Sequence, residues 1–242
     1  MPTIPATNDS HINKNIAANY GGSWDACHDA TSGVLAASAE STTTGMARIV
    51  VFTYAGDTRW IIHRTFMEFD TSGISVAPSE ATLKIWGLSQ TSTDVIAVKG
   101  TQADTLSTAD YDNLDVSVPY SAEVATWSTS GYNDFTLNAA ALQAMVDEDS
   151  FKVAIISYDH DYLDVDPGPP SVSIQAGCYF SEADNGDADK IPHIDYTSGY
   201  VAPVFWTEME SNGGDIKIKG GRVVVGVDHD GPSSLPGNGA RR

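Results

Sequence analysis

The stretch Phe180-Ser181-Glu182-Ala183, followed after an acidic loop by Ile191-Pro192-His193-Ile194-Asp195-Tyr196, predicts the last hairpin of a β-sandwich. The run 174–180 before the loop alternates in character, as a half-buried strand does. The loop itself, Asp184-Asn185-Gly186-Asp187-Ala188-Asp189, is dense in turn-forming residues. Pro192 suits the first position of a short or edge strand, because proline donates no ladder hydrogen bond.

Similar short runs of β-branched and aromatic residues recur along the chain between Gly, Asp, Ser and Pro clusters. They predict strands at 11–14, 48–54, 59–69, 81–88, 95–99, 134–137, 152–158, 172–180 and 193–196. Many short strands joined by irregular loops favour antiparallel sheets. We therefore expect an all-β, antiparallel, jelly-roll-like β-sandwich, with one short helix at 139–146 that Asn138 caps.

Alternation is clearest at residues 64–69. Phe66 and Glu68 fall on one face of this strand, and Thr65, Met67 and Phe69 fall on the other. One face of the strand is predicted to be core.

The ordered set of motifs resembles the DNRLRE domain, which overlaps carbohydrate-binding module family 96. The motifs are Asp9-Ser10-His11-Ile12 with Asn19-Tyr20-Gly21-Gly22, then Arg64-Thr65-Phe66-Met67-Glu68-Phe69-Asp70, then Glu80-Ala81-Thr82-Leu83, and the closing hairpin. The resemblance covers residues 9–197 and implies a jelly-roll-like sandwich, mostly found in extracellular proteins. Lys190-Ile191 stands where the family has an arginine before the proline, and residues 30–48 are unusually rich in Ser, Thr and Ala. Ligand residues are therefore not carried over.

Composition limits the partners. The chain of 242 residues has a net charge of -19, which argues against a nucleic-acid surface, since such surfaces bind phosphates through Lys and Arg. No apolar run approaches the roughly 20 residues that span a bilayer, so no membrane partner is expected. Residues 1–14 lack a secretory leader pattern. We expect a virion protein made in the host cytoplasm and released by lysis, with an extracellular protein as the alternative.

Cys27 and Cys178 are too few for a disulfide scaffold and have no metal-binding spacing. Buried free thiols are the simplest expectation.

Calcium is the one cofactor that the sequence suggests, because it prefers six to eight oxygen ligands. Two acidic segments offer them. The candidate ligands are Glu182, Asp184, Asn185, Asp187 and Asp189 in one segment, and Asp159, Asp161 and Asp164 in the other. Solvated acidic turns held by Asx hydrogen bonds are the alternative for both segments.

Sugar binding would use exposed aromatic faces. Trp24, in a glycine-rich stretch, and Trp127, among Ser and Thr, are the surface candidates, while Trp60 and Trp86 are expected to pack. Packing is an alternative for Trp24 and Trp127 too.

The chain divides near residue 198, which gives a sandwich at 1–197 and a C-terminal hairpin with a flexible tail at 198–242. Asp215-Ile216-Lys217-Ile218-Lys219, Gly220-Gly221 and Arg222-Val223-Val224-Val225 predict the hairpin, which is marginal by itself. We expect this unit to be an assembly element that contacts other virion proteins or copies of itself. Its contact residues would be Ile216, Ile218, Val223, Val225, Lys217, Lys219, Arg222, Arg241 and Arg242.

No catalytic motif is present: the chain has no GxSxG, no HExxH and no glycine-rich phosphate loop. The function expected from the sequence is a non-enzymatic structural protein exposed on a bacteriophage particle, as a capsid decoration, head fibre or tail-associated component. One alternative is a carbohydrate-binding module that attaches a particle or an enzyme to polysaccharide, and the two roles coincide if the particle recognises surface glycans. A polysaccharide-degrading enzyme that uses two carboxylates is the other alternative.

Overall fold

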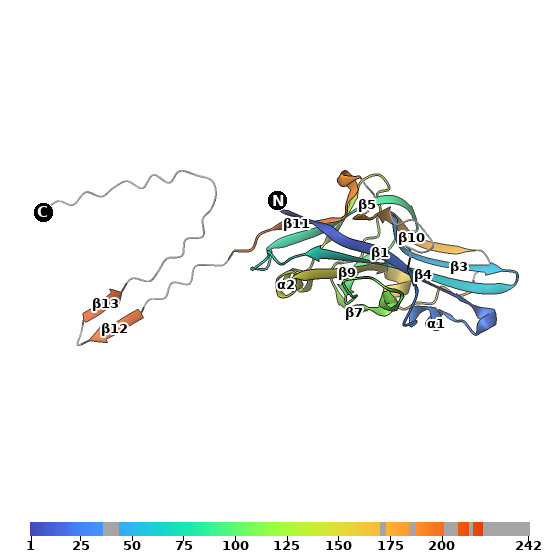
Figure 1. Cartoon of the computed structure of the whole chain (residues 1–242), viewed down its shortest axis with the longest axis horizontal. Helices are drawn as coiled ribbons and strands as arrows, with labels where there is room; N and C mark the ends of the chain where they lie inside the picture. The colour runs from blue at the N-terminus through green and yellow to red at the C-terminus, as the bar shows by residue number, and fades with distance from the viewer. Residues whose placement is uncertain (36–43, 170–172, 184–186, 201–207, 213–214, 220–242) are drawn as a thin grey trace. The chain divides into compact units, whose positions relative to one another are not determined.

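A computed structural model describes residues 1–35, 44–169, 173–183, 187–200, 208–212 and 215–219 (Figure 1). The chain forms two compact units, Met1–Tyr200 and Val201–Arg242. The first unit is the sandwich. Within the described residues, no helix is long and apolar enough to cross a membrane.

The sandwich is built from strands that run antiparallel to their neighbours. They are β1 (Thr3–Ala17), β2 (Val34–Leu35), β3 (Thr44–Tyr54), β4 (Asp57–Asp70), β5 (Glu80–Thr91), β6 (Val95–Gly100), β7 (Leu114–Pro119), β8 (Tyr132–Thr136), β9 (Ser150–Ser157), β10 (Ile174–Ser181) and β11 (His193–Thr197). The predicted all-β antiparallel fold is confirmed. Each predicted strand is present, though most are longer than expected, and β2 and β7 were not predicted.

Short helices lie between the strands. They are α1 (Trp24–His28), α2 (Ala139–Asp147), the 3-10 turns η1 (Ala18–Tyr20), η3 (Thr108–Asp112) and η6 (Ala188–Lys190), and the π-helical turn η4 (Tyr158–Tyr162). The predicted helix is α2, and its cap is confirmed, because the Asn138 side chain accepts hydrogen bonds from the backbone of Ala140 and Ala141. The expectation of a single helix is wrong, since Ser23 caps α1 in a stretch that was expected to be a turn.

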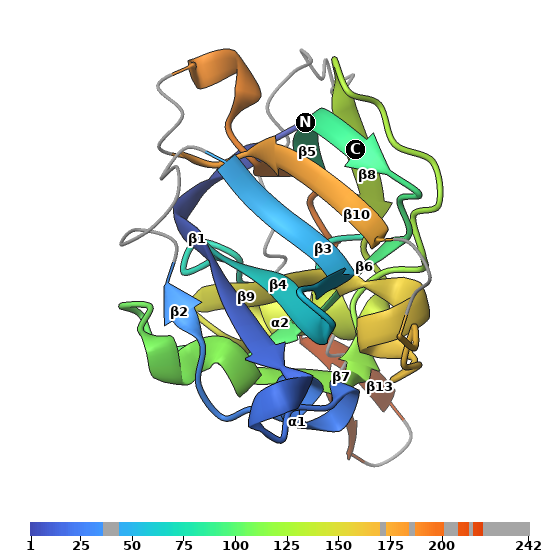
Figure 2. The same cartoon turned by 90° about the vertical axis from the view of Figure 1, so that its right-hand side faces the viewer.

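Strand β4 is the centre of the topology. It pairs along most of its length with β1, while its other edge pairs first with β3 and then, from Thr65 onward, with β9. Where β3 leaves β4, the Thr65 hydroxyl donates to the Met46 carbonyl and accepts from the Met46 amide. The Thr65 side chain therefore replaces the backbone hydrogen bonds between β3 and β4 at the point where the two strands separate. Beyond β3 the sheet continues through β10 and β5 to β11, which pairs with the start of β1. Figure 2 shows β10 beside β3.

The sandwich core lies where the sheet folds over on itself, so that β5, β8, β10 and β11 cover β4, β6 and β9. Helix α2 packs on this core through Ala141, Ala144 and Met145. The large, fully buried side chains of the sandwich core include Met67, Phe69, Leu83, Ile85, Phe135, Phe151, Val153, Phe180 and Ile194.

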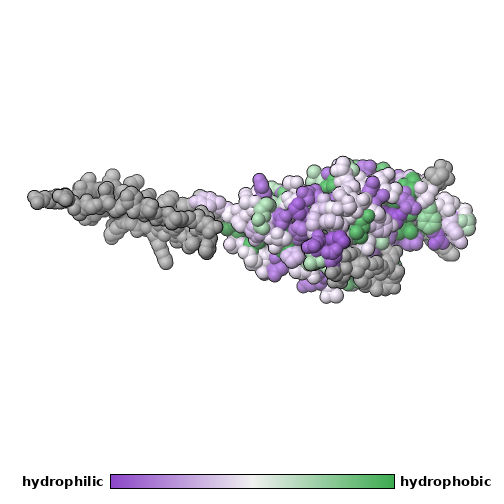
Figure 3. Space-filling model, turned by 90° about the horizontal axis from the view of Figure 1, so that it is seen from above, coloured by the Kyte–Doolittle hydropathy of each residue, from purple (hydrophilic) through white to green (hydrophobic). Residues whose placement is uncertain are grey.

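A second core covers the opposite face of β4. It is formed by Ile12, Trp24, Cys27, Ile49, Val51, Trp60, Ile62, Phe66, Ile96, Val98, Tyr111, Ala154 and Ile156. Residues 62–67 of β4 are consequently all buried. The predicted alternation at 65–69 is present, but both faces of the strand are core. Figure 3 shows polar and apolar residues interspersed on the visible surface of the sandwich.

A buried ion pair joins the second core to the acidic segment 159–166. The guanidinium of Arg64 donates from Nε to Asp161 Oδ2 at 3.0 Å and from a terminal nitrogen to Asp161 Oδ1 at 2.7 Å. It also donates to the carbonyls of Tyr111 and His28, and lies 4.3 Å from the Tyr111 ring centroid. Burial by itself lowers the pKa of Arg64, but the Asp161 carboxylate outweighs burial and raises the pKa above its ordinary value. The Arg64 guanidinium therefore stays charged.

Both cysteines are free and buried, as expected. Burial raises the pKa of the Cys27 thiol to about 12, so the thiolate is not formed at neutral pH. Cys27 acts as a small apolar member of the second core.

The C-terminal unit contains a hairpin other than the predicted one, whose pairing of 215–219 with 222–225 stays a prediction. Strand β13 (Asp215–Lys219) pairs with β12 (Glu208–Asn212), which precedes it in the chain. Gly213-Gly214 separates these strands in the sequence, and two glycines are as strong a turn signal there as at 220–221. The predicted partner strand, together with Arg222, Val223, Val225, Arg241 and Arg242, lies outside the described residues.

Replacing Arg64 with Met should lower the free energy of unfolding by about 3–5 kcal/mol, because it leaves the buried Asp161 carboxylate unpaired. Lys84→Met is the matched control, since it breaks the solvent-facing pair of Lys84 with Asp134 and should cost less than about 1 kcal/mol. Urea unfolding of both variants measures the difference. Equal losses in the two variants would show that Arg64 does not anchor the second core.

Candidate functional site

The candidate site lies on the face of β4 that carries Ile61 and His63. The strand register aligns Gln175, Val50, Ile61 and Asn15 in one row across β10, β3, β4 and β1. The next row contains Arg48 and His63. Residues paired in this way project from the same face of a sheet. Polar, aromatic and aliphatic side chains thus gather on one surface.

A groove of about 750 Å³ occupies this face. It is lined by Met46, Arg48, Val50, Phe52, Thr53, Ile61, His63, Ser173, Gln175 and Tyr179. We call it the β3 groove, after the strand that supplies half of the lining. Its volume is typical of a ligand site, and its mixture of an apolar floor with a few polar groups is typical of one too.

Arg48 is fixed in the β3 groove by strand β10. Its guanidinium donates to the Tyr179 hydroxyl and to Gln175 Oε1, and lies 5.0 Å from the Tyr179 ring centroid. No carboxylate within the described residues forms an ion pair with Arg48. The arginine is therefore held in position while its positive charge stays unneutralised.

His63 lies at the base of the β3 groove and is 6% exposed. Burial, and then the nearby His11 and Arg48, lower the pKa of His63 to about 3, so the imidazole is neutral at physiological pH. Its Nδ1 atom is buried and has no hydrogen-bond partner in the part of the chain that the structure describes. A buried polar atom without a partner carries a free-energy cost, so this histidine is held in place at the expense of stability.

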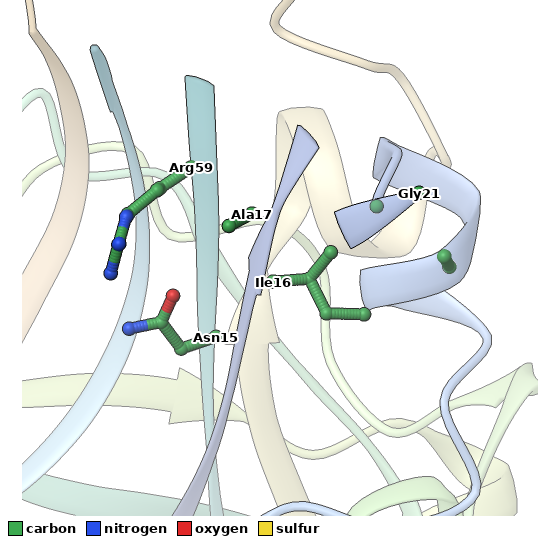
Figure 4. A pocket seen from close by; sticks show the side chains of 7 residues that line it. Asn15, Ile16, Ala17, Gly21 and Arg59 are labelled. Carbon is green, nitrogen blue, oxygen red and sulfur yellow. The ribbon is translucent and has the colours of Figure 1, made fainter. Parts of the chain in front are cut away.

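A second concavity of about 500 Å³, the β1 hollow, adjoins this face (Figure 4). It is lined by Asn15, Ile16, Ala17, Gly21, Gly22, Ala26 and Arg59. Figure 4 shows Asn15 and Arg59 extending to one side of the strands and Ile16 to the other. Gly21 has a φ of 76°, which favours glycine, and a Cβ on Gly22 would lie 2.0 Å from Ile16 Cγ2. The two glycines let the η1 turn pack tightly against β1.

The acidic segment 159–166 uses its oxygens on protein partners. Asp161 binds Arg64, and Asp164 Oδ1 accepts from Trp24 Nε1 at 2.9 Å. Asp166 accepts from Trp60 Nε1 and from the Gly168 amide. The predicted ligands Asp161 and Asp164 are thus side chains that fasten the segment to the second core.

The loop 182–189 is split between the interior and the surface. Glu182 is 1% exposed, with its carboxylate 3.7 Å from His11 Nδ1. Asp187 caps η6 by accepting from the Asp189 amide and pairs with Lys190. Asp184 and Asn185 lie outside the described residues. No group of three His, Cys, Asp or Glu side chains that could hold a metal is found among the residues described. Calcium binding by this loop stays a prediction.

The two tryptophans predicted as surface ligands behave differently. Trp24 is 2% exposed, stacked on His28 at a centroid distance of 5.5 Å, so its expected place at the surface is wrong. The cause is helix α1, which turns the indole into the second core. Trp127 is half-buried against Phe135 and Phe180. Trp60 is buried, as expected. Trp86 is half-buried and lies beneath the Lys190 ammonium.

Sequence reasoning missed the residues of the β3 groove. Arg48 shares one face of β3 with Met46, Val50 and Phe52, so an apolar strand face with one cation was visible in the sequence. The partners Gln175 and Tyr179 were not visible, because they lie more than a hundred residues from Arg48 and such pairing leaves no local signal. His63 is closer in sequence, but its pairing with Arg48 depends on the register of β3 and β4.

No protein-family model and no curated protein sequence matches this chain. The likeness to the DNRLRE domain therefore stays a resemblance of ordered motifs.

The Asp94 carboxyl group lies against the end of β9 and the residues that follow it. Asp94 is 8% exposed, and its carboxylate accepts from the Ser157 hydroxyl and the Asp159 amide. Burial, and then Asp159, raise the pKa of Asp94 to about 7. The folded protein therefore favours the protonated carboxyl.

Asp94→Asn should change the pH dependence of stability. The contribution of Asp94 to stability is fully present below its ordinary pKa of 3.8 and is lost as the pH rises through about 7. Because asparagine has no proton to lose, the variant should gain on the order of 1–3 kcal/mol relative to the wild type between pH 5 and pH 8. Denaturant unfolding at both pH values measures this gain.

Asp70→Asn serves as the control. Hydrogen bonds from Ser72 lower the pKa of this exposed carboxyl, so the substitution should give no gain at pH 8. A parallel pH profile for wild type and Asp94→Asn would contradict the assignment.

Proposed function

We propose that this chain is a non-enzymatic virion protein whose sandwich binds polysaccharide through the β3 groove. The observation that carries the proposal is the open groove in which a fixed arginine, a neutral buried histidine and a tyrosine ring meet on one sheet face. Binding of this kind needs no reacting group.

The chemistry of the lining suits a sugar. The Tyr179 and Phe52 rings offer apolar faces for sugar C–H groups, and Ser173, Gln175 and His63 offer hydrogen bonds to hydroxyls. Among the described residues, the lining contains no Asp or Glu, although the chain has 32 of them. A pair of carboxylates, which most glycosidases use, is therefore not part of this lining.

The charge at the groove favours an acidic sugar. Arg48 is an unneutralised cation on a protein of net charge -19. Guanidinium groups bind carboxylates with charge-assisted hydrogen bonds, which are roughly twice as strong as neutral ones. We therefore infer that the ligand contains carboxylated sugars.

Display on a particle is supported by the division into two units. The compact unit Met1–Tyr200 carries the groove, and the unit Val201–Arg242 carries the β12–β13 hairpin. An isolated two-stranded hairpin is marginal in water, so this unit is suited to contacts with other virion proteins or with copies of the chain. The setting of the proposal is thus the virion, with an extracellular module as the alternative.

Arg48→Met and Tyr179→Leu should each weaken binding of acidic oligosaccharides at least tenfold, a loss of about 1.4 kcal/mol, because each removes a fixed contact in the groove. A glycan array of neutral and uronate-containing oligosaccharides, followed by titration calorimetry of the bound probes, measures the effect. Lys84→Met and Tyr200→Leu, which lie outside the groove lining, are the matched controls and should bind like the wild type.

Unchanged binding by both groove variants, or wild-type binding of neutral sugars only, would overturn the assignment. The melting temperature of each variant separates loss of binding from loss of fold.

Truncation after Tyr200 should leave a folded, monomeric sandwich that no longer self-associates or joins particles, because the assembly unit is removed. Light scattering measures the mass, and thermal unfolding should shift by no more than about 2 °C. Truncation after Lys219 keeps β12 and β13 but removes Arg222, Val223, Val225, Arg241 and Arg242, so it shows which half of the unit assembly requires. If the shorter protein still assembles with unchanged stoichiometry, the C-terminal unit is not the assembly element.

A further inference from the structure

We propose that the β3 groove and the β1 hollow form one continuous path for an internal stretch of a linear acidic polysaccharide, with Arg59 and Asn15 as a second subsite. This inference rests on the proposed function of the groove. It adds a direction, along β3 and β4 from Arg48 to Arg59, and a class of ligand, a polymer rather than a chain end.

Strand register makes the two concavities neighbours. Ile61 lines the groove and pairs with Asn15, which lines the hollow. Phe52 lines the groove and pairs with Arg59, which lines the hollow. Directly paired residues on one face of a sheet have Cβ atoms only about 4.5–5.5 Å apart. No other strand stands between the two concavities.

The floor between the two arginines is apolar. Val50 and Ile61 form a cross-strand pair, and Phe52 lies next on the same side of β3. Val50 is 8% exposed, so the half-buried Ile61 and Phe52 present most of the accessible apolar surface. Such a floor suits the C–H faces of successive sugar rings. Because the groove and the hollow are open concavities, a chain can enter at one and leave at the other.

The two cations are spaced for more than one sugar. Arg48 on β3 and Arg59 on β4 are four residues out of register, which places their Cα atoms roughly 14 Å apart by ordinary strand spacings. Two carboxylates on one polymer chain could contact one guanidinium group each.

Arg59 has local partners, and its subsite is therefore the weaker of the two. Its guanidinium lies 5.9 Å from the Tyr54 ring centroid, and its Nε is 4.0 Å from Asp57 Oδ2. Asp57 also accepts a hydrogen bond from the Asn19 amide. Arg59 Nε is buried and has no hydrogen-bond partner within the described residues. Asn15 is exposed beside Arg59 and supplies an amide for sugar hydroxyls (Figure 4).

Titration calorimetry of the full chain with di-, tetra- and hexagalacturonate tests the path. Wild-type affinity should rise at least tenfold from dimer to hexamer. Arg59→Met and Asn15→Ala should each remove most of this rise while leaving the affinity for the dimer within about twofold. Arg48→Met should weaken dimer and hexamer alike. Arg59→Lys should restore part of the length dependence, and Lys84→Met should behave as the wild type.

Each failure has a distinct reading. If the dimer binds in an Arg48-dependent manner but affinity does not depend on length, the continuous path is wrong and the groove assignment stands. If none of the galacturonates binds, and hyaluronan oligosaccharides of the same lengths do not bind either, the proposed function itself fails. Binding of poly-glutamate with the same dependence on Arg48 and Arg59 would overturn the polysaccharide in favour of an acidic polypeptide.

Discussion

The buried ion pair between Arg64 and Asp161 is the constraint on which the rest of the sandwich depends. It fastens the acidic segment 159–166, helix α1 and the η3 turn to one face of β4 through the carbonyls of His28 and Tyr111. A buried charge is tolerated only when it is paired and hydrogen-bonded, and here both terminal nitrogens and Nε of Arg64 have partners. With this face of β4 covered, the groove is built on its other face at Ile61 and His63.

Carboxylates and cations lie in different parts of the sandwich. Asp161 binds Arg64, and Asp164 and Asp166 accept hydrogen bonds from two indole groups. These three carboxylates therefore fasten the segment 159–166 to the second core. The lining of the β3 groove, within the residues described, has a single cation and no carboxylate. An acidic polymer would be repelled by most of the surface and attracted to this face. Such electrostatic contrast selects the place of binding more than it adds affinity.

Residue patterns within single elements predicted much of the fold but little of the candidate site. Alternation at 64–69 and the cap at Asn138 were sufficient to predict β4 and α2, because each signal lies within one element. The burial of Trp24 was not predictable in this way, since Ser23 starts a helix inside a glycine-rich stretch. The acidic segments were predicted as calcium ligands because the sequence shows the carboxylate oxygens. It does not show the arginine and indole groups that donate hydrogen bonds to them in the fold. Arg48, His63 and Tyr179 come from three strands, and only the sheet register brings them together.

Amide chemical-shift mapping of the full chain with tetragalacturonate tests the central claim most directly, because it locates the ligand without altering the protein. The account predicts that the largest shifts lie on β10, β3 and the first half of β4, centred on Arg48, His63 and Tyr179, and extend to Asn15 on β1. Shifts centred instead on Trp86 and Trp127, or spread evenly over the sandwich, would contradict it.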